Sequence, residues 1–264
     1  MIGWDHPATA ERYERFCRRH ARYRRANDVL AREAALGSGL RVLDVGAGSG
    51  RTASAALRRL GRDGAVVCVE PAAAMREAGR RRLRDARVTW RADLPDEPEA
   101  FDRVLAGAVI WQLDPLAEWI ARLAGLLRRG GALAFDIPAL YLGEPDEPGG
   151  GDDPLLLDLV GRLAADRAPA RRSEPPPASR WRLGLSDVEA ALRAAGLAPR
   201  AWAFRQRLTQ LAHARWLSIP VLTDRLLPGV APEERDRRIA RAFTGVDAGS
   251  FKWERWRGWT AWKS

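Results

Sequence analysis

The sequence predicts an α/β protein with a doubly wound, mostly parallel sheet of seven strands and helical lid insertions. Two observations predict this class. Short apolar segments alternate with segments of helical period over about residues 40–138, and glycine or proline marks the ends of most of them. Such alternation places parallel strands side by side, with helices on both faces of the sheet. Two further segments, 198–208 and part of 251–263, bring the number of expected strands to seven.

The first five strands are expected because each segment is short, apolar and followed by turn residues. They are 41–46 (RVLDVG), 65–70 (AVVCVE), 87–90 (RVTW), 101–111 (FDRVLAGAVIW, with its exit loop) and 132–138 (ALAFDIP). The last segment, 251–263, carries four tryptophans that alternate poorly. We therefore expect only part of it to form a strand, at an edge of the sheet.

Helices are expected where apolar residues recur at helical spacing between capping residues. Gly61 closes the second of these segments, Pro71 lies near the first position of the third, and a serine caps the segment that begins at Ser186. The expected helical segments are about 8–35 (one or two helices), 50–61, 71–85, 115–131, 155–167, 186–196, 211–227 and 232–243.

Composition divides the chain into parts. We expect an N-terminal helical cap (1–38), a core of alternating strands and helices (39–138) and a lid insertion rich in proline, glycine and acids (139–180). Residues 181–264 would complete the core, with a helical insertion around 209–245. No internal repeat is present.

The chain is strongly basic, with a net charge of +10 and an isoelectric point near 10.8. Only Lys252 and Lys263 are lysines, so arginine supplies most of the positive charge, and it is interspersed with acids. This pattern favours a solvated basic surface, with an anion-steering patch as the alternative.

Other features exclude several classes of protein. No run of about 18 apolar residues predicts a membrane span, and the N-terminal residues lack an apolar signal core. Cys17 and Cys68 form neither a disulfide framework nor a zinc motif. We expect a cytoplasmic protein without a metal site.

The loop after the first strand, GAGSG, contains Gly46, Gly48 and Gly50. It matches neither the GxGxxG dinucleotide fingerprint, because Arg51 stands where the last glycine belongs, nor a P-loop, because no GK[ST] follows. Asp44 ends the strand, and a carboxylate there would repel a pyrophosphate. The glycines still allow the backbone to approach a bulky ligand, which the acid predicts to carry a positive group.

Two more acids follow neighbouring strands. Glu70 ends the second strand and could accept hydrogen bonds from two ribose hydroxyls. Asp93 follows the third strand and could accept from an adenine amino group, while Met75 could pack on the adenine face. The ends of parallel strands meet at one edge of a sheet, so these residues are expected around one cleft.

These motifs resemble the class I S-adenosylmethionine (SAM)-dependent methyltransferases, of the small-molecule, type 11/25-like group. VLDVGAGSG is similar to their first motif, and VCVEPAAAM to their acidic second-strand motif. RADLP, FDRVLAGAVIWQLDP and LRRGGALAFDIP follow in the same order as the third, fourth and fifth strand regions. The resemblance covers about 40–138 well and 180–205 weakly, and it implies a Rossmann-like fold, methyl transfer and SAM as the cofactor, with S-adenosylhomocysteine (SAH) as the product.

The resemblance also implies residue roles. The glycines would pass under the methionine part and the ribose, Glu70 would hold the ribose, and Asp44 would lie near the cofactor's ammonium group. Ala108 would offer its backbone to the methionine part. The cofactor-binding residues expected on this basis are Tyr13, Tyr23, Asp44, Gly46, Ala47, Gly48, Gly50, Glu70, Pro71, Met75, Asp93, Leu94 and Ala108.

The acceptor side departs from the family pattern. Many small-molecule members carry His-His-Leu after the fourth strand, where this chain has Trp111, Gln112 and Leu113. The catalytic candidates are therefore elsewhere: Tyr13, His20 and His213. Trp4, Trp111 and Trp216 are the candidates for substrate contact, because an aromatic roof suits a flat, apolar or cationic acceptor.

Three functions remain open. The leading hypothesis is methyl transfer to a small molecule, such as a secondary metabolite, by a monomer or homodimer that acts away from membranes. The alternative is an RNA methyltransferase that uses the basic surface, although the chain lacks the Asn/Asp-Pro-Pro-Tyr/Phe run of many nucleic-acid methylases. The third is a non-catalytic, cofactor-binding scaffold, because fold alone does not define function.

Overall fold

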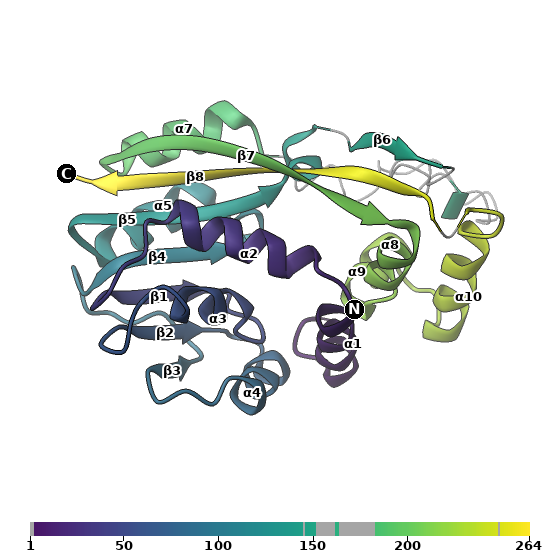
Figure 1. Cartoon of the computed structure of the whole chain (residues 1–264), viewed down its shortest axis with the longest axis horizontal. Helices are drawn as coiled ribbons and strands as arrows, with labels where there is room; N and C mark the ends of the chain where they lie inside the picture. Colours follow the sequence, from purple (N-terminus) through teal and green to yellow (C-terminus); the bar gives the residue numbers. More distant parts are fainter. Residues whose placement is uncertain (1–2, 145, 152–161, 164–182, 248) are drawn as a thin grey trace.

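The computed structural model describes residues 3–144, 146–151, 162–163, 183–247 and 249–264 (Figure 1). The helix expected at 155–167, and most of the expected lid, lie outside the described residues. Among those that are described, no helix is long and apolar enough to cross a bilayer.

The sheet has the expected mostly parallel core. Its order is β3-β2-β1-β4-β5-β8-β6, with β7 paired to β8, and the first five strands in this order run parallel while β8 is antiparallel to its neighbours. The strands are β1 (Arg41–Val45), β2 (Ala65–Val69), β3 (Val88–Arg91), β4 (Phe101–Gly107), β5 (Leu127–Pro138), β6 (Glu147–Gly150), β7 (Leu197–Thr209) and β8 (Phe251–Lys263).

The helices lie close to the expected segments, but the helix expected at 50–61 ends at Leu57, before Gly61, and residues 127–131, expected to end a helix, begin β5. They are α1 (Pro7–Arg19), α2 (Arg22–Glu33), α3 (Arg51–Leu57), α4 (Ala73–Arg82), α5 (Leu116–Leu126), α7 (Leu185–Ala194), α8 (Gln210–Leu217), α9 (Pro220–Leu226) and α10 (Pro232–Ala242), with short 3₁₀ turns at Ile110–Gln112 and Ala139–Leu142.

Helices cover both faces of the sheet because neighbouring residues of each parallel strand face opposite cores. Val42 packs in the core beneath α2 and α3, whereas Leu43 packs in the core beneath α5 and α7. In β4, Leu105 packs in the first of these cores and Val104 in the second. This two-sided burial explains why the strands read as continuous apolar runs.

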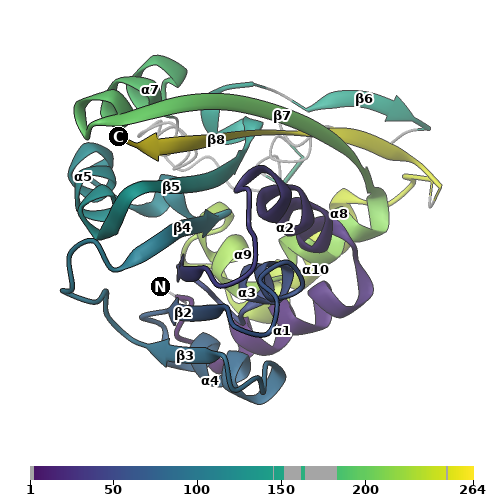
Figure 2. The same cartoon turned by 60° about the vertical axis from the view of Figure 1, so that its left-hand side comes forward.

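A separate helical group lies beyond the carboxyl ends of the parallel strands. Figures 1 and 2 show α1, α8, α9 and α10 together at that end. These helices share a third core, which includes Phe16, Trp216, Ile219, Ile239 and Phe243. They therefore form a roof above the strand ends, where the sequence predicts the cleft.

The last strand corrects one expectation. All of β8 is extended, and it lies inside the sheet, paired along its length with β7 and over Trp256–Trp262 with β5. Tryptophans spaced three apart fall on alternate faces of a strand, so Trp256 stacks near Phe204 on one face and Trp259 near Phe135 on the other. The spacing that looked irregular suits a strand with both faces covered.

Three smaller expectations were also wrong. The sheet has an eighth described strand, β6, because β8 extends past β5 and leaves an edge with which Glu147–Gly150 can pair. Helix α4 begins at Ala73, since the Ala72 N–H donates to Glu70 Oε1 and Pro71 stays outside the helix. Helix α7 is preceded by Gly184, so Ser186 lies inside the helix and does not cap it.

Candidate functional site

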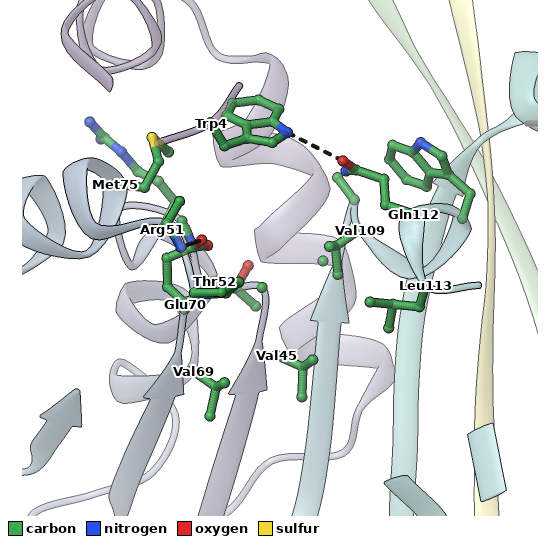
Figure 3. A pocket seen from close by; sticks show the side chains of 18 of the residues that line it. Trp4, Val45, Arg51, Thr52, Val69, Glu70, Met75, Val109, Gln112 and Leu113 are labelled. Carbon is green, nitrogen blue, oxygen red and sulfur yellow. Dashed lines mark hydrogen bonds between the residues drawn. The ribbon is translucent and has the colours of Figure 1, made fainter. Parts of the chain in front are cut away.

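One cavity of about 410 Å³ lies at the carboxyl ends of β1, β2 and β4, under the roof (Figure 3). Its lower wall comes from the loops that follow these strands. Its upper wall comes from α1 and α8 of the roof and from α2, which we also count as part of the roof. Most of the predicted site residues line it: Trp4, Tyr13, Tyr23, Gly46, Ala47, Gly48, Glu70, Pro71, Met75, Asp93, Leu94, Ala108, Trp111 and Trp216. Asp44, Gly50, His20 and His213 are not among its lining residues.

The glycine loop needs glycine for two reasons. Gly46, Gly48 and Gly50 have φ values of 64°, 56° and 76°, in the left-handed region that favours glycine. A Cβ atom at Gly46 would also lie 2.6 Å from Cγ2 of Val109. The loop thus turns sharply under the cavity and presents its main chain to it.

Glu70 ties this loop to the next one. Its Oε2 accepts a hydrogen bond from the Gly48 N–H at 2.8 Å, and its Oε1 accepts from the Ala72 N–H at 2.9 Å. Burial raises the pKa of the Glu70 carboxyl. Each oxygen has used one lone pair, so each can still accept a hydrogen bond from a hydroxyl group on the cavity side. The side chain lies at the end of β2 in Figure 3.

The adenine end of the expected site is partly apolar. Met75 is buried, and its Cε lies 3.4 Å from the position of a Cβ on Gly48. Asp93 also lines the cavity but is exposed to solvent. These residues converge on one end of the cavity from three successive loops, as their positions after neighbouring strands predict.

Asp136, which sequence reasoning missed, supports the opposite end. The Ala108 N–H donates to its Oδ1 at 2.7 Å, which holds Ala108 at a φ of 53° beside the cavity. The side chain is fully buried, and Oδ2 has no hydrogen-bond partner among the described residues. Burial raises the pKa of Asp136 to about 7. Its position near the end of a buried strand was the only signal in the sequence.

Asp44 and Gly50 lie behind the cavity. Asp44 is fully buried, and its Oδ2 accepts from the Ala53 N–H at 2.9 Å in the first turn of α3. Burial raises the pKa of Asp44 to about 8. Gly50 precedes α3, and a Cβ there would meet the Trp90 ring at 3.0 Å. In this structure both residues position the loop and its helix from behind.

Aromatic side chains form the roof of the cavity. Trp4 and Tyr13 meet edge to face at 5.8 Å, and Tyr13 lies 5.5 Å from Tyr23. Trp4 Nε1 donates to Gln112 Oε1 at 3.2 Å, which joins the N-terminal segment to the loop after β4 (Figure 3). Trp111 stacks on Tyr141 at 4.5 Å.

The Tyr23 hydroxyl is held as a hydrogen-bond donor. It accepts from Arg22 and from Trp216 Nε1, each at 3.0 Å, so both of its lone pairs are used. Burial raises the pKa of Tyr23 to about 12. The hydroxyl therefore stays protonated at neutral pH, and its hydrogen can only be donated to a further acceptor.

The candidate histidines lie apart from the cavity. His213 is buried, its Nε2 is 3.4 Å from Lys252 Nζ, and burial together with the charges of Lys252 and Arg22 lowers its pKa. His20 lines a hollow on the outer side of α1. Tyr13 does line the cavity, but burial raises its pKa well above 10.0. No described histidine lines the cavity.

Two buried ionic groups connect the roof to the core, and the sequence did not predict either. Glu14 on α1 accepts from Ser49 Oγ in the glycine loop and, at 2.7 Å, from Arg51 at the start of α3. Arg22 on α2 forms a buried ion pair with Glu254 on β8. The partners are distant in the chain, so no local pattern identifies them.

Comparison with known proteins agrees with this geometry. Residues 43–133, about a third of the chain, match a family model described as a methyltransferase domain. No curated protein matches the chain by sequence. The segment 43–133 contains the glycine loop, Glu70 and Asp93 described above.

Solved structures match over most of the chain. A putative methyltransferase from Bacillus halodurans is 17% identical, with a TM-score of 0.56 over 90% of this chain and 98% of that one. A putative sarcosine dimethylglycine methyltransferase from Galdieria sulphuraria is 17% identical, with a TM-score of 0.54 over 91% and 86%. The phosphoethanolamine N-methyltransferase 2 of Haemonchus contortus, in a complex with SAH, is 18% identical, with a TM-score of 0.52 over 90% and 52%.

The fold is the one that these methyltransferase structures share, so the predicted Rossmann-like α/β fold is confirmed. Residues 43–133 match the methyltransferase domain model, which supports the predictions of methyl transfer and of SAM as the cofactor.

Proposed function

We propose that this enzyme methylates a nitrogen or an electron-rich carbon of a small-molecule acceptor held beneath the aromatic roof. The observation that carries the proposal is the lining of the acceptor side, which includes Trp4, Trp111 and Trp216 but no described histidine. Both cavity-lining tyrosines with raised pKa values stay protonated at neutral pH. A hydroxyl acceptor commonly needs a base, whereas an amine or electron-rich carbon needs little help.

The residues at the other end fit SAM. The free lone pairs of Glu70 suit the two ribose hydroxyls, and Met75 and Asp93 lie where the adenine would bind. The Ala108 backbone, held by Asp136, would meet the methionine part. When bound, SAM supplies a methyl group on a sulfonium, which is transferred by in-line displacement.

The chain's contribution to the rate is alignment and removal of water. The glycine loop borders one end of the cavity, and aromatic side chains that can shield an acceptor from water line the other. Aromatic faces also favour a cation, such as a methylated ammonium product. The Tyr23 hydroxyl can donate to an acceptor's oxygen or ring nitrogen and so orient it.

Calorimetric titration with SAM and SAH tests the cofactor site. We expect saturable binding, which Glu70→Ala weakens by about 10- to 100-fold because hydrogen bonds to a charged group are lost. The control is Glu77→Ala, an exposed acid on α4 that pairs with Arg81, and it should change the affinity by no more than about twofold. Equal effects of the two substitutions would contradict the assignment.

An acceptor screen tests the substrate class. The panel would contain amines, electron-rich heteroaromatics, phenols, carboxylic acids and transfer RNA, each incubated with methyl-labelled SAM. We expect label on nitrogen or carbon of small molecules. Transfer only to phenols or carboxylic acids would overturn the acceptor chemistry, and transfer only to RNA would favour the alternative that the basic charge suggests. Cofactor binding without transfer to any acceptor would favour a scaffold.

A further inference from the structure

A second hollow, of about 280 Å³, lies on the outer side of α1, away from the main cavity. Three arginines of α1 line it, Arg12, Arg15 and Arg19, spaced so that they share one face of the helix. Arg215 of α8 lines the same hollow, together with His20, Phe16, Ser218 and one acid, Asp236. Four guanidinium groups from two helices therefore surround one concavity.

Acids neutralise only part of this charge. Arg12 forms two hydrogen bonds of 2.8 Å with Asp236, and Arg15 pairs with the exposed Glu11. In the described part of the chain, neither Arg19 nor Arg215 forms an ion pair with a carboxylate. Arg19 and Arg215, one on each of two helices, thus contribute two positive charges that no described carboxylate pairs with.

The pKa of His20 is lowered in these surroundings. Burial lowers the pKa of its imidazole, and the charges of Arg215 and Arg19 lower it further. Arg19 precedes His20 in the chain, and Arg215 lines the same hollow as His20. The His20 ring lies 5.0 Å from the ring of the buried Phe16, so two aromatic rings also line the hollow. A group of arginines in a hollow is suited to a compact dianion, because guanidinium groups bind phosphate through paired N–H donors.

We propose that this hollow is a binding site for a small phosphate-type dianion, held between Arg19 on α1 and Arg215 on α8. The site is separate from the methyl-transfer cavity, but both of its helices also contribute residues to that cavity. Helix α1 carries Tyr13 on the cavity side, and Trp216 follows Arg215 directly. A dianion that bridges the two arginines would hold these two parts of the roof together, so its occupancy would tighten the acceptor side.

Titration of the full-length protein with pyrophosphate, and separately with inorganic phosphate, at constant ionic strength tests the proposal. We expect saturable binding that the double variant Arg19→Ala, Arg215→Ala weakens by about tenfold or more. The matched control is Arg18→Ala, which removes an exposed arginine of the same helix that does not line the hollow, with an expected change within about twofold. Absence of saturable binding, or equal losses in the control and the double variant, would overturn the proposal.

A second measurement uses the unmodified protein and so does not depend on how the variants fold. The His20 imidazole is titrated by NMR with and without pyrophosphate, its signal being assigned with His20→Asn. A dianion between the two arginines would offset their charge, so the pKa of His20 should rise. An unchanged His20 titration under saturating pyrophosphate would place the anion elsewhere and overturn the site. Binding of RNA without any binding of pyrophosphate would also overturn the proposed site.

Discussion

The two walls of the main cavity are built in different ways. On the cofactor side, each functional contact joins loops or elements that follow neighbouring strands: Gly48 with Glu70, and Ala108 with Asp136. On the roof, the contacts join residues far apart in the chain, as in Arg22 with Glu254 and Tyr23 with Trp216. The cofactor side is thus a property of one parallel sheet, whereas the roof exists only when the two ends of the chain have met.

This difference has an energetic consequence. The cofactor side relies on backbone N–H groups, glycine conformations and buried acids, which the sheet itself orients. The roof relies on a buried ion pair and a few side-chain hydrogen bonds between helices and β8. Substitutions in the roof should therefore act on stability first, and substitutions beside the glycine loop on ligand binding and on the pH dependence of folding.

The largest expected effect is that of Arg22→Met. It leaves the Glu254 carboxylate buried without its ion-pair partner, and breaking such a pair typically costs about 3–5 kcal/mol. Urea unfolding followed by circular dichroism measures the loss. The control is Arg193→Ala, which breaks an exposed pair with Glu189 on α7 and should cost no more than about 0.5 kcal/mol. A loss below about 1 kcal/mol for Arg22→Met would show that the roof does not depend on this pair.

Asp136→Asn tests the buried acid under the cofactor side. The wild-type carboxyl keeps its proton up to about pH 7 when folded but loses it near 3.8 when unfolded. The folded state therefore binds more protons between these values, and stability falls as the pH rises from about 4 to 7. Asparagine keeps an acceptor for the Ala108 N–H and should reduce this fall by about 2–4 kcal/mol.

Urea unfolding at several pH values measures this dependence. Asp44, whose pKa is raised to about 8, contributes a fall of the same sign that remains in the variant. The control is Asp96→Asn, the same substitution at an exposed position. If Asp136→Asn and the wild type lose stability in parallel over this range, Asp136 is ionised in the folded protein.

Gly46→Ala and Gly125→Ala form a matched pair of glycine substitutions. The first places a methyl group 2.6 Å from Val109 at a φ of 64°, and we expect a loss of about 2–3 kcal/mol together with weaker SAM binding. The second adds a methyl group in open space within α5, where alanine should stabilise the protein by about 0.5–1 kcal/mol. Thermal unfolding and SAM titration measure both. Similar behaviour of the two variants would contradict the role assigned to the loop.

Among the substitutions of cavity-lining residues, Tyr23→Phe should have the smallest effect. It removes one hydrogen-bond donor from the cavity and one acceptor from Trp216 and Arg22. We expect kcat/KM for the best acceptor of the screen to fall about three- to tenfold. Separate measurement of SAM affinity shows which ligand the hydroxyl contacts. An unchanged kcat/KM and an unchanged SAM affinity would exclude Tyr23 from the site.

The sequence predicted which residues line the lower wall of the cavity because their determinants are local. Gly46, Glu70 and Met75 each lie at a fixed place after a strand, and the order of the strands brings them to one edge. The positions of most helices followed in the same way from periodicity. Asp44 was expected near the cofactor's ammonium group; its side chain points into the first turn of α3 and does not line the cavity, so any contact would be through its backbone or a water molecule.

The roof could not be predicted for a physical reason. Which side chains meet across it depends on how α1, α2 and α8 pack against β8, and single-sequence patterns carry no information on such distant pairs. His213 illustrates this: it was a catalytic candidate by residue type, yet it lies buried beside Lys252. The strand β8 is a second example. The spacing of its tryptophans is explained by its position between β5 and β7, which the sequence alone does not give.

A crystal structure of the protein with SAH would test the proposed cofactor site most directly. We expect adenosine between Glu70, Met75 and Asp93, with both ribose hydroxyls on the Glu70 carboxylate. The sulfur would face the aromatic roof near Trp111, with the amino-acid part of SAH along the Ala108 backbone. SAH bound outside this cavity, or a Glu70 carboxylate turned away from the ribose, would contradict it.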